Sequence, residues 1–235
     1  MALQGRGVRP FPRLLAAAAL SALAASSQAQ VSGSLGLDSD YRYRGVSLSR
    51  SQPSVHASLN YDAPQRWYAG ASATRAALTP AQTASQLSGY AGWSTATVDG
   101  RSLELGADGS HFAGVSGYDF AEAYAGVLSE RWSARVYYAP DYYGRRMQTS
   151  YLELNAFPPL DRRIRLFAHA GALVPLAGAS GDAARVRFDA SAGVGVVRGR
   201  WDLHAAVFAA TRGGPYPAVY DGRRAALVFG AAVSF

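Results

Sequence analysis

The sequence predicts an all-β fold, a closed antiparallel transmembrane β-barrel of about twelve strands. Polar and apolar side chains alternate with a period of two along most of the chain, so each predicted strand has one apolar face and one polar or charged face. Short and long connections alternate between these strands, as they do in outer-membrane barrels of bacteria. The last predicted strand, 224–235, also alternates and ends on Phe235, an ending typical of such barrels.

The first 29 residues predict a secretory signal peptide rather than part of the barrel. Arg6, Arg9 and Arg13 precede an apolar run at 14–25, and the small residues of Ser27-Gln28-Ala29 suit a signal peptidase. The run is shorter than the ~20 apolar residues that a membrane helix needs. We therefore expect export through the inner membrane, cleavage after residue 29, and one outer-membrane barrel domain over 30–235.

Composition narrows the function classes. The mean hydropathy is −0.04, so the 49% of hydrophobic residues are dispersed, as a barrel with one lipid-facing side requires. The chain has no Cys, which excludes disulfides, thiolate metal sites and a Cys nucleophile. The formal charge is +7, but every basic residue is Arg and these are dispersed with no basic helix or patch, so we expect no nucleic-acid binding.

The first predicted strand, 31–44, shows the alternation most clearly. Leu35 and Leu37 fall on one face, whereas Asp38 and Arg42 fall on the other. The strands are about nine to twelve residues long, a length that crosses a bilayer when tilted. An even number of them places both chain ends on one side. The other eleven predicted strands are 54–61, 67–74, 86–94, 102–108, 121–127, 132–138, 151–156, 164–170, 185–196, 201–208 and 224–235.

Connection lengths and aromatic residues predict the orientation of the barrel. The five short connections, expected in the periplasm, are 62–66, 95–101, 128–131, 157–163 and 197–200. The six long ones, expected outside, are 45–53, 75–85, 111–118, 140–147, 174–184 and 211–223. Aromatic rings gather where membrane meets water. The predicted interface aromatics are Tyr41, Tyr43, Trp67, Trp93, Trp132, Tyr138, Trp201 and Phe235, with the four Trp residues on the periplasmic side.

Polar residues of the opposite face predict the pore lining. They include eight acids and seven arginines, so the charge is nearly balanced and predicts no ion preference. The lumen of a twelve-stranded barrel is modest, and cross-strand ion pairs can either line an open channel or fill it. The predicted pore-lining residues are Asp38, Asp40, Arg42, Arg44, His56, Glu104, Asp108, Glu122, Arg135, Glu153, Arg165, His169, Arg185, Arg187, Asp189, Asp202, His204 and Arg224.

The cluster of Asp40, Arg42 and Arg44 has two interpretations. It forms part of a mouth or constriction, or it forms a salt-bridge network that fixes the register where the first and last strands meet. We favour the register role.

Several segments resemble the TorF family of porins, a Gcw_chp-type group of bacterial outer-membrane proteins. The resemblance rests most specifically on Ser39-Asp40-Tyr41-Arg42-Tyr43-Arg44-Gly45-Val46-Ser47. Looser matches are Tyr118-Asp119-Phe120-Ala121-Glu122-Ala123-Tyr124 and the segments 53–55, 137–142 and 158–160. It covers essentially the whole mature chain. It implies an outer-membrane barrel with a channel role and supplies no established substrate.

Catalysis has little support in the sequence. His111 begins an outer loop near Ser110 and Ser116, and His56 shares a face with Ser58, but no Gly-x-Ser-x-Gly elbow is present. No ligand spacing predicts a metal site and no phosphate-binding loop predicts a nucleotide, so we expect no cofactor. We therefore predict that the protein is not an enzyme.

We expect a porin-like channel for passive passage of small polar solutes or ions. The alternatives are a structural or receptor barrel with an occluded lumen that acts through its outer loops, and an outer-membrane lipid-modifying enzyme. The loops 140–147 and 211–223 carry tyrosines that either fold inward as a plug or form an exposed rim, which we prefer. The expected partners are outer-membrane lipid, the barrel assembly machinery, which would read the last strand, and the solutes themselves.

Overall fold

The computed structural model describes residues 30–79, 82–97, 99–115, 117–158, 160–161, 163–215 and 224–235. The predicted signal peptide at 1–29 lies outside the described residues, so it stays a prediction. The described residues contain no helix long and apolar enough to cross a membrane.

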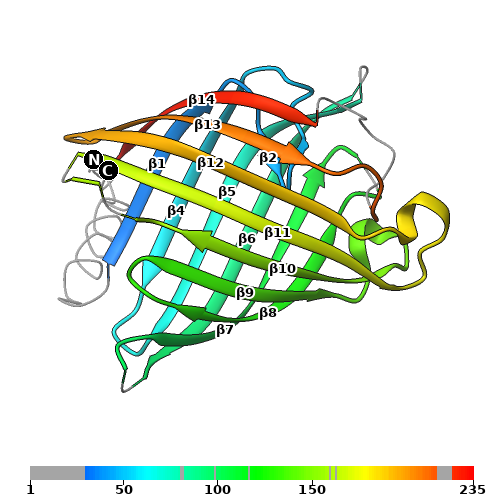
Figure 1. Ribbon diagram of the computed structural model, residues 1–235, viewed down its shortest axis with the longest axis horizontal. Coiled ribbons are helices and arrows are strands. Elements are labelled where there is room, and N and C mark those ends of the chain that lie inside the picture. Colours follow the sequence, from blue (N-terminus) through cyan, green and yellow to red (C-terminus); the bar gives the residue numbers. More distant parts are fainter. Residues whose placement is uncertain are drawn as a thin grey trace, which may run out of the picture.

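Twelve antiparallel strands close into one barrel, as predicted (Figure 1). Neighbours in the sequence are neighbours in the wall, and β1 completes the ring by pairing with both β4 and β14. The strands are β1 (Gln30–Asp38), β4 (Ser54–Asp62), β5 (Trp67–Thr79), β6 (Gln82–Ala96), β7 (Ser102–Ala113), β8 (Phe120–Leu128), β9 (Trp132–Ala139), β10 (Gln148–Ala156), β11 (Ile164–Ala177), β12 (Arg187–Arg198), β13 (Trp201–Ala210) and β14 (Ala225–Ser234).

The seam between β1 and β14 is what makes the wall continuous. Leu35 lies opposite Val233 on one side and opposite Ala57 of β4 on the other. Gly33 and Phe235 exchange two backbone hydrogen bonds of 3.0 Å, which extend the pairing to the end of the chain. Because hydrocarbon offers backbone groups no partners, a closed wall is the arrangement in which strands can face lipid.

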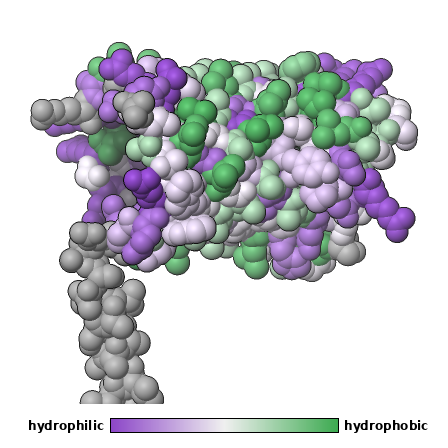
Figure 2. All heavy atoms as spheres, turned by 90° about the horizontal axis from the view of Figure 1, so that it is seen from below, coloured by the Kyte–Doolittle hydropathy of each residue, from purple (hydrophilic) through white to green (hydrophobic). Residues whose placement is uncertain are grey.

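The wall has the two faces that the alternation predicts. Large apolar side chains on the outside, such as Leu59, Leu105 and Phe229, are more than half exposed, whereas charged residues of the same strands point inward. Figure 2 shows hydrophobic residues along the side of the barrel between more hydrophilic ends. This is the surface expected of a protein whose outer wall contacts lipid.

The two ends of the barrel differ. We call the end that holds Gln30, Phe235 and the turn at 63–66 the short-turn end, and the opposite end the long-loop end. Strands β5, β9 and β13 each begin with Trp at the short-turn end, and Trp67 lies directly opposite Trp93 of β6. All four tryptophans are therefore at the end where the sequence places them.

The first predicted strand is shorter than expected. β1 ends at Asp38, and residues 42–47 form a separate hairpin of β2 (Arg42–Tyr43) and β3 (Val46–Ser47) that is not part of the wall. The alternation continues through this hairpin because it is also extended, so sequence periodicity does not distinguish it from a membrane strand.

The predicted long loop at 75–85 is wrong. β5 and β6 continue through it, with Arg75 paired to Ser85 and Ala77 to Thr83, and only two residues separate the strands. Its small and polar residues resembled a loop, but Ala76 and Ala84 are buried inside the barrel, where small side chains fit against the hairpin.

We predict that a charge on the outer wall destabilises the barrel. Leu152 is 52% exposed in the middle of β10, so Leu152→Arg places a guanidinium in hydrocarbon and should lower the free energy of unfolding by about 2–4 kcal/mol. The measurement is denaturant unfolding in phospholipid vesicles. Gln65→Arg, on the exposed turn after β4, is the control and should change little. Equal effects of the two substitutions would contradict the lipid-facing assignment.

Candidate functional site

The hairpin of β2 and β3 folds into the lumen. Its two-residue turn is Arg44-Gly45, and both residues have positive φ, 48° and 74°, as a tight turn that matches the strand twist requires. A Cβ on Gly45 would lie 2.6 Å from Cβ of Asp189 and 2.8 Å from Cβ of Ala210. The turn is thus packed against β12 and β13, which lie three and two strands from β1 in the wall.

Asp40 holds the hairpin together. Its carboxylate accepts hydrogen bonds from Arg42 Nε at 2.7 Å, from Ser49 Oγ at 3.0 Å and from the hydroxyl of Ser47. Asp40 is buried, and its guanidinium partner also donates to the carbonyl of Gly45 at 3.0 Å. The Asp40–Arg42 pair therefore fixes the hairpin itself.

Arg44 fastens the hairpin to the wall. Its guanidinium makes a two-pronged ion pair with Glu122 of β8, with one nitrogen–oxygen distance of 3.0 Å, and both side chains are almost fully buried. The ring of Tyr151 lies under the guanidinium, 4.0 Å from its carbon. Burial alone lowers the pKa of Arg44, but Tyr43, Tyr142 and Glu122 outweigh it and the net pKa lies well above its usual value. Arg44 is consequently charged, and it pairs across the lumen rather than at the seam of the barrel.

An aromatic cluster fills the lumen around the hairpin at the long-loop end. Loop 140–147 folds inward through the short 3-10 turn η1 (Tyr142–Gly144), and both of its tyrosines are buried. The expected exposed rim is therefore wrong for this loop, whose tyrosines gain more by packing inside the barrel than by facing water. Of the loop 211–223, Pro215 is buried, while Tyr216 and Tyr220 lie outside the described residues. The buried cluster comprises Leu48, Ala76, Ala84, Phe112, Phe120, Ala139, Tyr142, Tyr143, Tyr151 and Leu173.

Two predicted interface aromatics belong to this interior. Tyr41 donates a hydrogen bond to Gln86 Oε1 at 3.0 Å, and the ring of Tyr43 lies 6.0 Å from that of Phe120. Their placement in an outer belt is wrong because the chain turns into the lumen after Asp38. Tyr138, in β9, does lie on the outer face and is 42% exposed.

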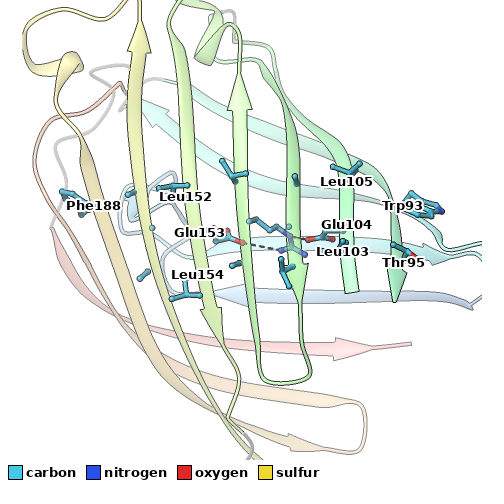
Figure 3. Close-up of a pocket in the computed structure, with 18 residues that line it drawn as sticks. Trp93, Thr95, Leu103, Glu104, Leu105, Leu152, Glu153, Leu154 and Phe188 are labelled. Atoms are coloured by element: carbon cyan, nitrogen blue, oxygen red, sulfur yellow. Dashed lines mark hydrogen bonds and ion pairs between the residues drawn. The ribbon is translucent and has the colours of Figure 1, made fainter. Parts of the chain in front are cut away.

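Below the hairpin, toward the short-turn end, lies a polar cavity of about 660 Å³. Arg135 lies in its wall between Glu104 and Glu153, the two glutamates labelled in Figure 3. The distance from Arg135 Nη1 to Glu153 Oε1 is 3.4 Å. Tyr68 donates to Glu104 at 2.7 Å and also contacts the hydroxyl of Tyr124 at 3.0 Å. The lining residues are Arg42, Tyr43, Arg44, Asp62, Tyr68, Tyr90, Ser94, Glu104, Asp108, Tyr124, Leu128, Arg135, Tyr137, Tyr151, Glu153 and His169.

A second hollow, of about 920 Å³, is lined mainly by apolar side chains of the outer wall, among them Leu105, Leu152 and Phe188 (Figure 3). Its chemistry suits hydrocarbon rather than a polar solute, so the candidate solute site is the inner cavity.

Other predicted pore residues meet on the opposite wall. Arg165 makes a bidentate pair with Asp202 at 3.0 and 2.9 Å. Asp38 lies between two histidines, 3.3 Å from Nδ1 of His56 and 3.2 Å from Nε2 of His204. Strands β1, β4, β11 and β13 thus bring these five side chains together.

A further inner group joins β10, β11 and β12. Asp189 accepts from Tyr151 at 3.2 Å and lies 2.9 Å from Nε2 of His169, whose Nδ1 is 2.8 Å from Asn155. This group adjoins the hairpin turn, since Asp189 is one of the two residues against which Gly45 packs.

Three predicted pore residues lie near the long loops instead. Arg185 follows the 3-10 turn η2 (Gly181–Ala184), is exposed, and lies 3.4 Å from Asp182. Arg224 is also exposed and precedes β14. Arg187, at the start of β12, donates to the carbonyl of Gly213 at 3.1 Å. Pore-lining positions are wrong for Arg185 and Arg224, because the strands end before the alternation in the sequence does.

The serine–histidine candidates do not come together as a catalytic group. His111 Nδ1 lies 2.6 Å from Asp119, but Ser110 points the other way and bonds to Gln86 at 3.0 Å. Ser116 lies outside the described residues. His56 contacts Asp38, and Ser58 bonds to Ser34 at 2.8 Å.

Sequence reasoning missed the tyrosines of the cavity. Tyr68, Tyr90, Tyr124 and Tyr137 line it, and all four fall on the polar face of the alternation. The predicted pore-lining set contains only charged residues and histidines, although the same alternation places these tyrosines inside.

The closed wall, the polar lumen and the pattern of turns define a porin-like outer-membrane β-barrel. Solved structures support this class. The chain superposes on the KdgM porin with a TM-score of 0.57 at 10% identity, over 87% of this chain and 99% of that one. The NanC porin gives a TM-score of 0.57 at 10% identity, over 88% of this chain and 99% of that one. The KdgM porin in complex with disordered oligogalacturonate gives a TM-score of 0.54 at 8% identity, over 87% of this chain and 98% of that one.

The chain belongs to the family described as "Bacterial protein of unknown function (Gcw_chp)", whose model matches residues 22–210. No curated protein matches the sequence. At such low identities the porins establish the fold.

We predict that breaking the Arg44–Glu122 pair is costly. Arg44→Met leaves a buried carboxylate without its counter-charge and should lower the free energy of unfolding by about 3–5 kcal/mol. Adding Glu122→Gln should recover part of this loss, because no buried charge then remains. The measurement is a double-mutant cycle in vesicles. Arg101→Met is the control: its pair with Asp99 is exposed and should contribute less than about 1 kcal/mol. A cycle with no coupling would contradict the anchoring role.

Proposed function

We propose that the protein is an outer-membrane channel for passive passage of small polar solutes or ions, narrowed by its own inner hairpin. The observation that supports this most strongly is the polar cavity beneath the hairpin. Charged inner-wall residues near the short-turn end are partly exposed, Arg165 at 42% and Arg135 at 28%, whereas those beside the hairpin are buried. The pathway thus opens toward the short-turn end and narrows at the hairpin.

The hairpin is suited to control the width of the pathway. It connects to the wall at 39–41 and at 48–53 and crosses the lumen between these points. Its contacts with the wall include the Arg44–Glu122 pair with β8 and the close packing of Gly45 on β12 and β13. Displacing the turn would remove one of two barriers between the cavity and the long-loop end, the other being the aromatic cluster around Tyr142 and Tyr143.

The cellular setting is part of the same proposal. We infer a signal peptide at 1–29, a short-turn end in the periplasm, and recognition of the strand ending at Phe235 by the barrel assembly machinery. Trp67, Trp93, Trp132, Trp201, Tyr138 and Phe235 would contact the membrane interface. The TorF name is likewise proposed from the resemblance of 39–47 and 118–124. Porin neighbours favour a channel over an enzyme.

A barrel with an occluded lumen that acts through its outer loops is the second candidate. The buried aromatic cluster around Tyr142 and Tyr143 favours it, because such packing resists opening. Electrical recording separates the two candidates.

We predict that substituting the hairpin glycine widens the channel. Gly45→Ala places a methyl group against Asp189 and Ala210 and should displace the turn, so single-channel conductance in planar bilayers should rise severalfold. Gly100→Ala is a matched control: Gly100 also has a positive φ, 79°, but a Cβ there meets nothing within 4 Å, so conductance should not change. Inserted barrels that show no conductance steps in either wild type or Gly45→Ala would exclude the channel and favour the occluded barrel.

A further inference from the structure

The cavity beneath the hairpin carries more negative charge than a count over the whole inner face indicates. Three guanidiniums line it or close it: Arg42, Arg44 and Arg135. Each already contacts carboxylates: Arg42 contacts Asp40, Arg44 contacts Glu122, and Arg135 lies between two glutamates. The positive charges are therefore neutralised where they stand.

The carboxylates outnumber these guanidiniums. In the part of the chain that the structure describes, six carboxylates line the cavity or pair with its arginines, against three guanidiniums, which leaves three negative charges. The His169–Asp189 pair adds no net positive charge in either protonation state of the imidazole. The six are Asp40, Asp62, Glu104, Asp108, Glu122 and Glu153.

Asp108 is the central member of this excess. It lies in β7 opposite Glu122 of β8 and lines the cavity. Its Oδ1 is buried, and among the described residues it has no hydrogen-bond partner. A carboxylate in this position has an unmet requirement for a donor or a cation, because burying such an oxygen without a partner is costly.

The rest of the cavity wall is suited to cations as well. The rings of Tyr68 and Tyr90 are 6.1 Å apart, and those of Tyr124 and Tyr137 are 5.4 Å apart. Tyrosine faces attract cations through the negative charge of the ring, and an ammonium group gains most where carboxylates are also near. An anion in the same place would meet uncompensated carboxylates.

We infer that the cavity is a cation-selecting vestibule that favours small cationic solutes, including organic ammonium compounds, over anions, with Asp108 as its main determinant. This inference deepens the proposed channel function and rests on it for its biological meaning. The electrostatic preference itself belongs to the cavity and can be measured without any current through the barrel.

The absence of cysteine makes a direct test possible. Ser94 lines the cavity on β6, so Ser94→Cys introduces a single thiol into the full-length protein. The probes are two methanethiosulfonate reagents of similar size, one bearing trimethylammonium and one bearing sulfonate. Their reaction rates are compared at low salt and about pH 8, where ordinary carboxylates are ionised. Gln65→Cys, on an exposed turn at the same end, gives the reference ratio.

We expect the cationic reagent to be favoured at Ser94→Cys over the reference by about threefold or more, because residual charges of the cavity act on the two probes with opposite sign. Adding Asp108→Asn should reduce this preference by about half or more. Asp161→Asn, which removes a fully exposed carboxylate at the same end of the barrel, should leave the preference unchanged.

A ratio equal to the reference, or one that favours the sulfonate, would overturn the inference, as would equal effects of Asp108→Asn and Asp161→Asn. The result is separable from the channel test. Cation preference in a barrel that never conducts would refute the channel and leave the vestibule, whereas a conducting barrel without the preference would refute only the vestibule.

Discussion

The backbone of every strand that faces hydrocarbon has to find its hydrogen-bond partners within the protein, and the rest of this structure depends on that requirement. It forces the wall to close, which places β1 beside β14 and gives the lumen its fixed girth. A closed wall has only two faces, so the polar side chains of twelve strands converge on one narrow interior. This convergence imposes a second requirement, because charges held close together out of bulk water need counter-charges.

The inner charges are paired differently at the two ends of the barrel. Near the long loops, the hairpin supplies Arg44 to Glu122 and the lumen is filled with aromatic rings. Near the short turns, Arg135 is shared by two glutamates and Arg165 is matched to Asp202, with space left between the walls. A nearly neutral inner face thus separates into a packed, paired region and an open region where carboxylates are in excess.

Much of the wall could be predicted from the sequence, because strand alternation is local and antiparallel neighbours follow one another along the chain. The seam, the short turns and the outward positions of Leu35 and Leu105 follow from that pattern. The hairpin could not be predicted in the same way. Tyr41, Tyr43 and Arg44 continue the alternation of β1 but contact β6, β8 and β10, far along the chain. Long-range contacts of this kind do not change the alternation of polar and apolar residues along the chain. For the same reason the sequence did not predict that β12 begins after Arg185, or that β5 and β6 pair continuously through Arg75.

The position of the hairpin inside the barrel constrains the order in which the molecule assembles. Residues 42–47 leave the ribosome early, yet the surfaces that receive them come from β8, β10, β12 and β13. The docking surface for Gly45 exists only after the chain has been threaded as far as Ala210 and those strands have come together. One of the earliest-made segments is therefore among the last to reach its final contacts.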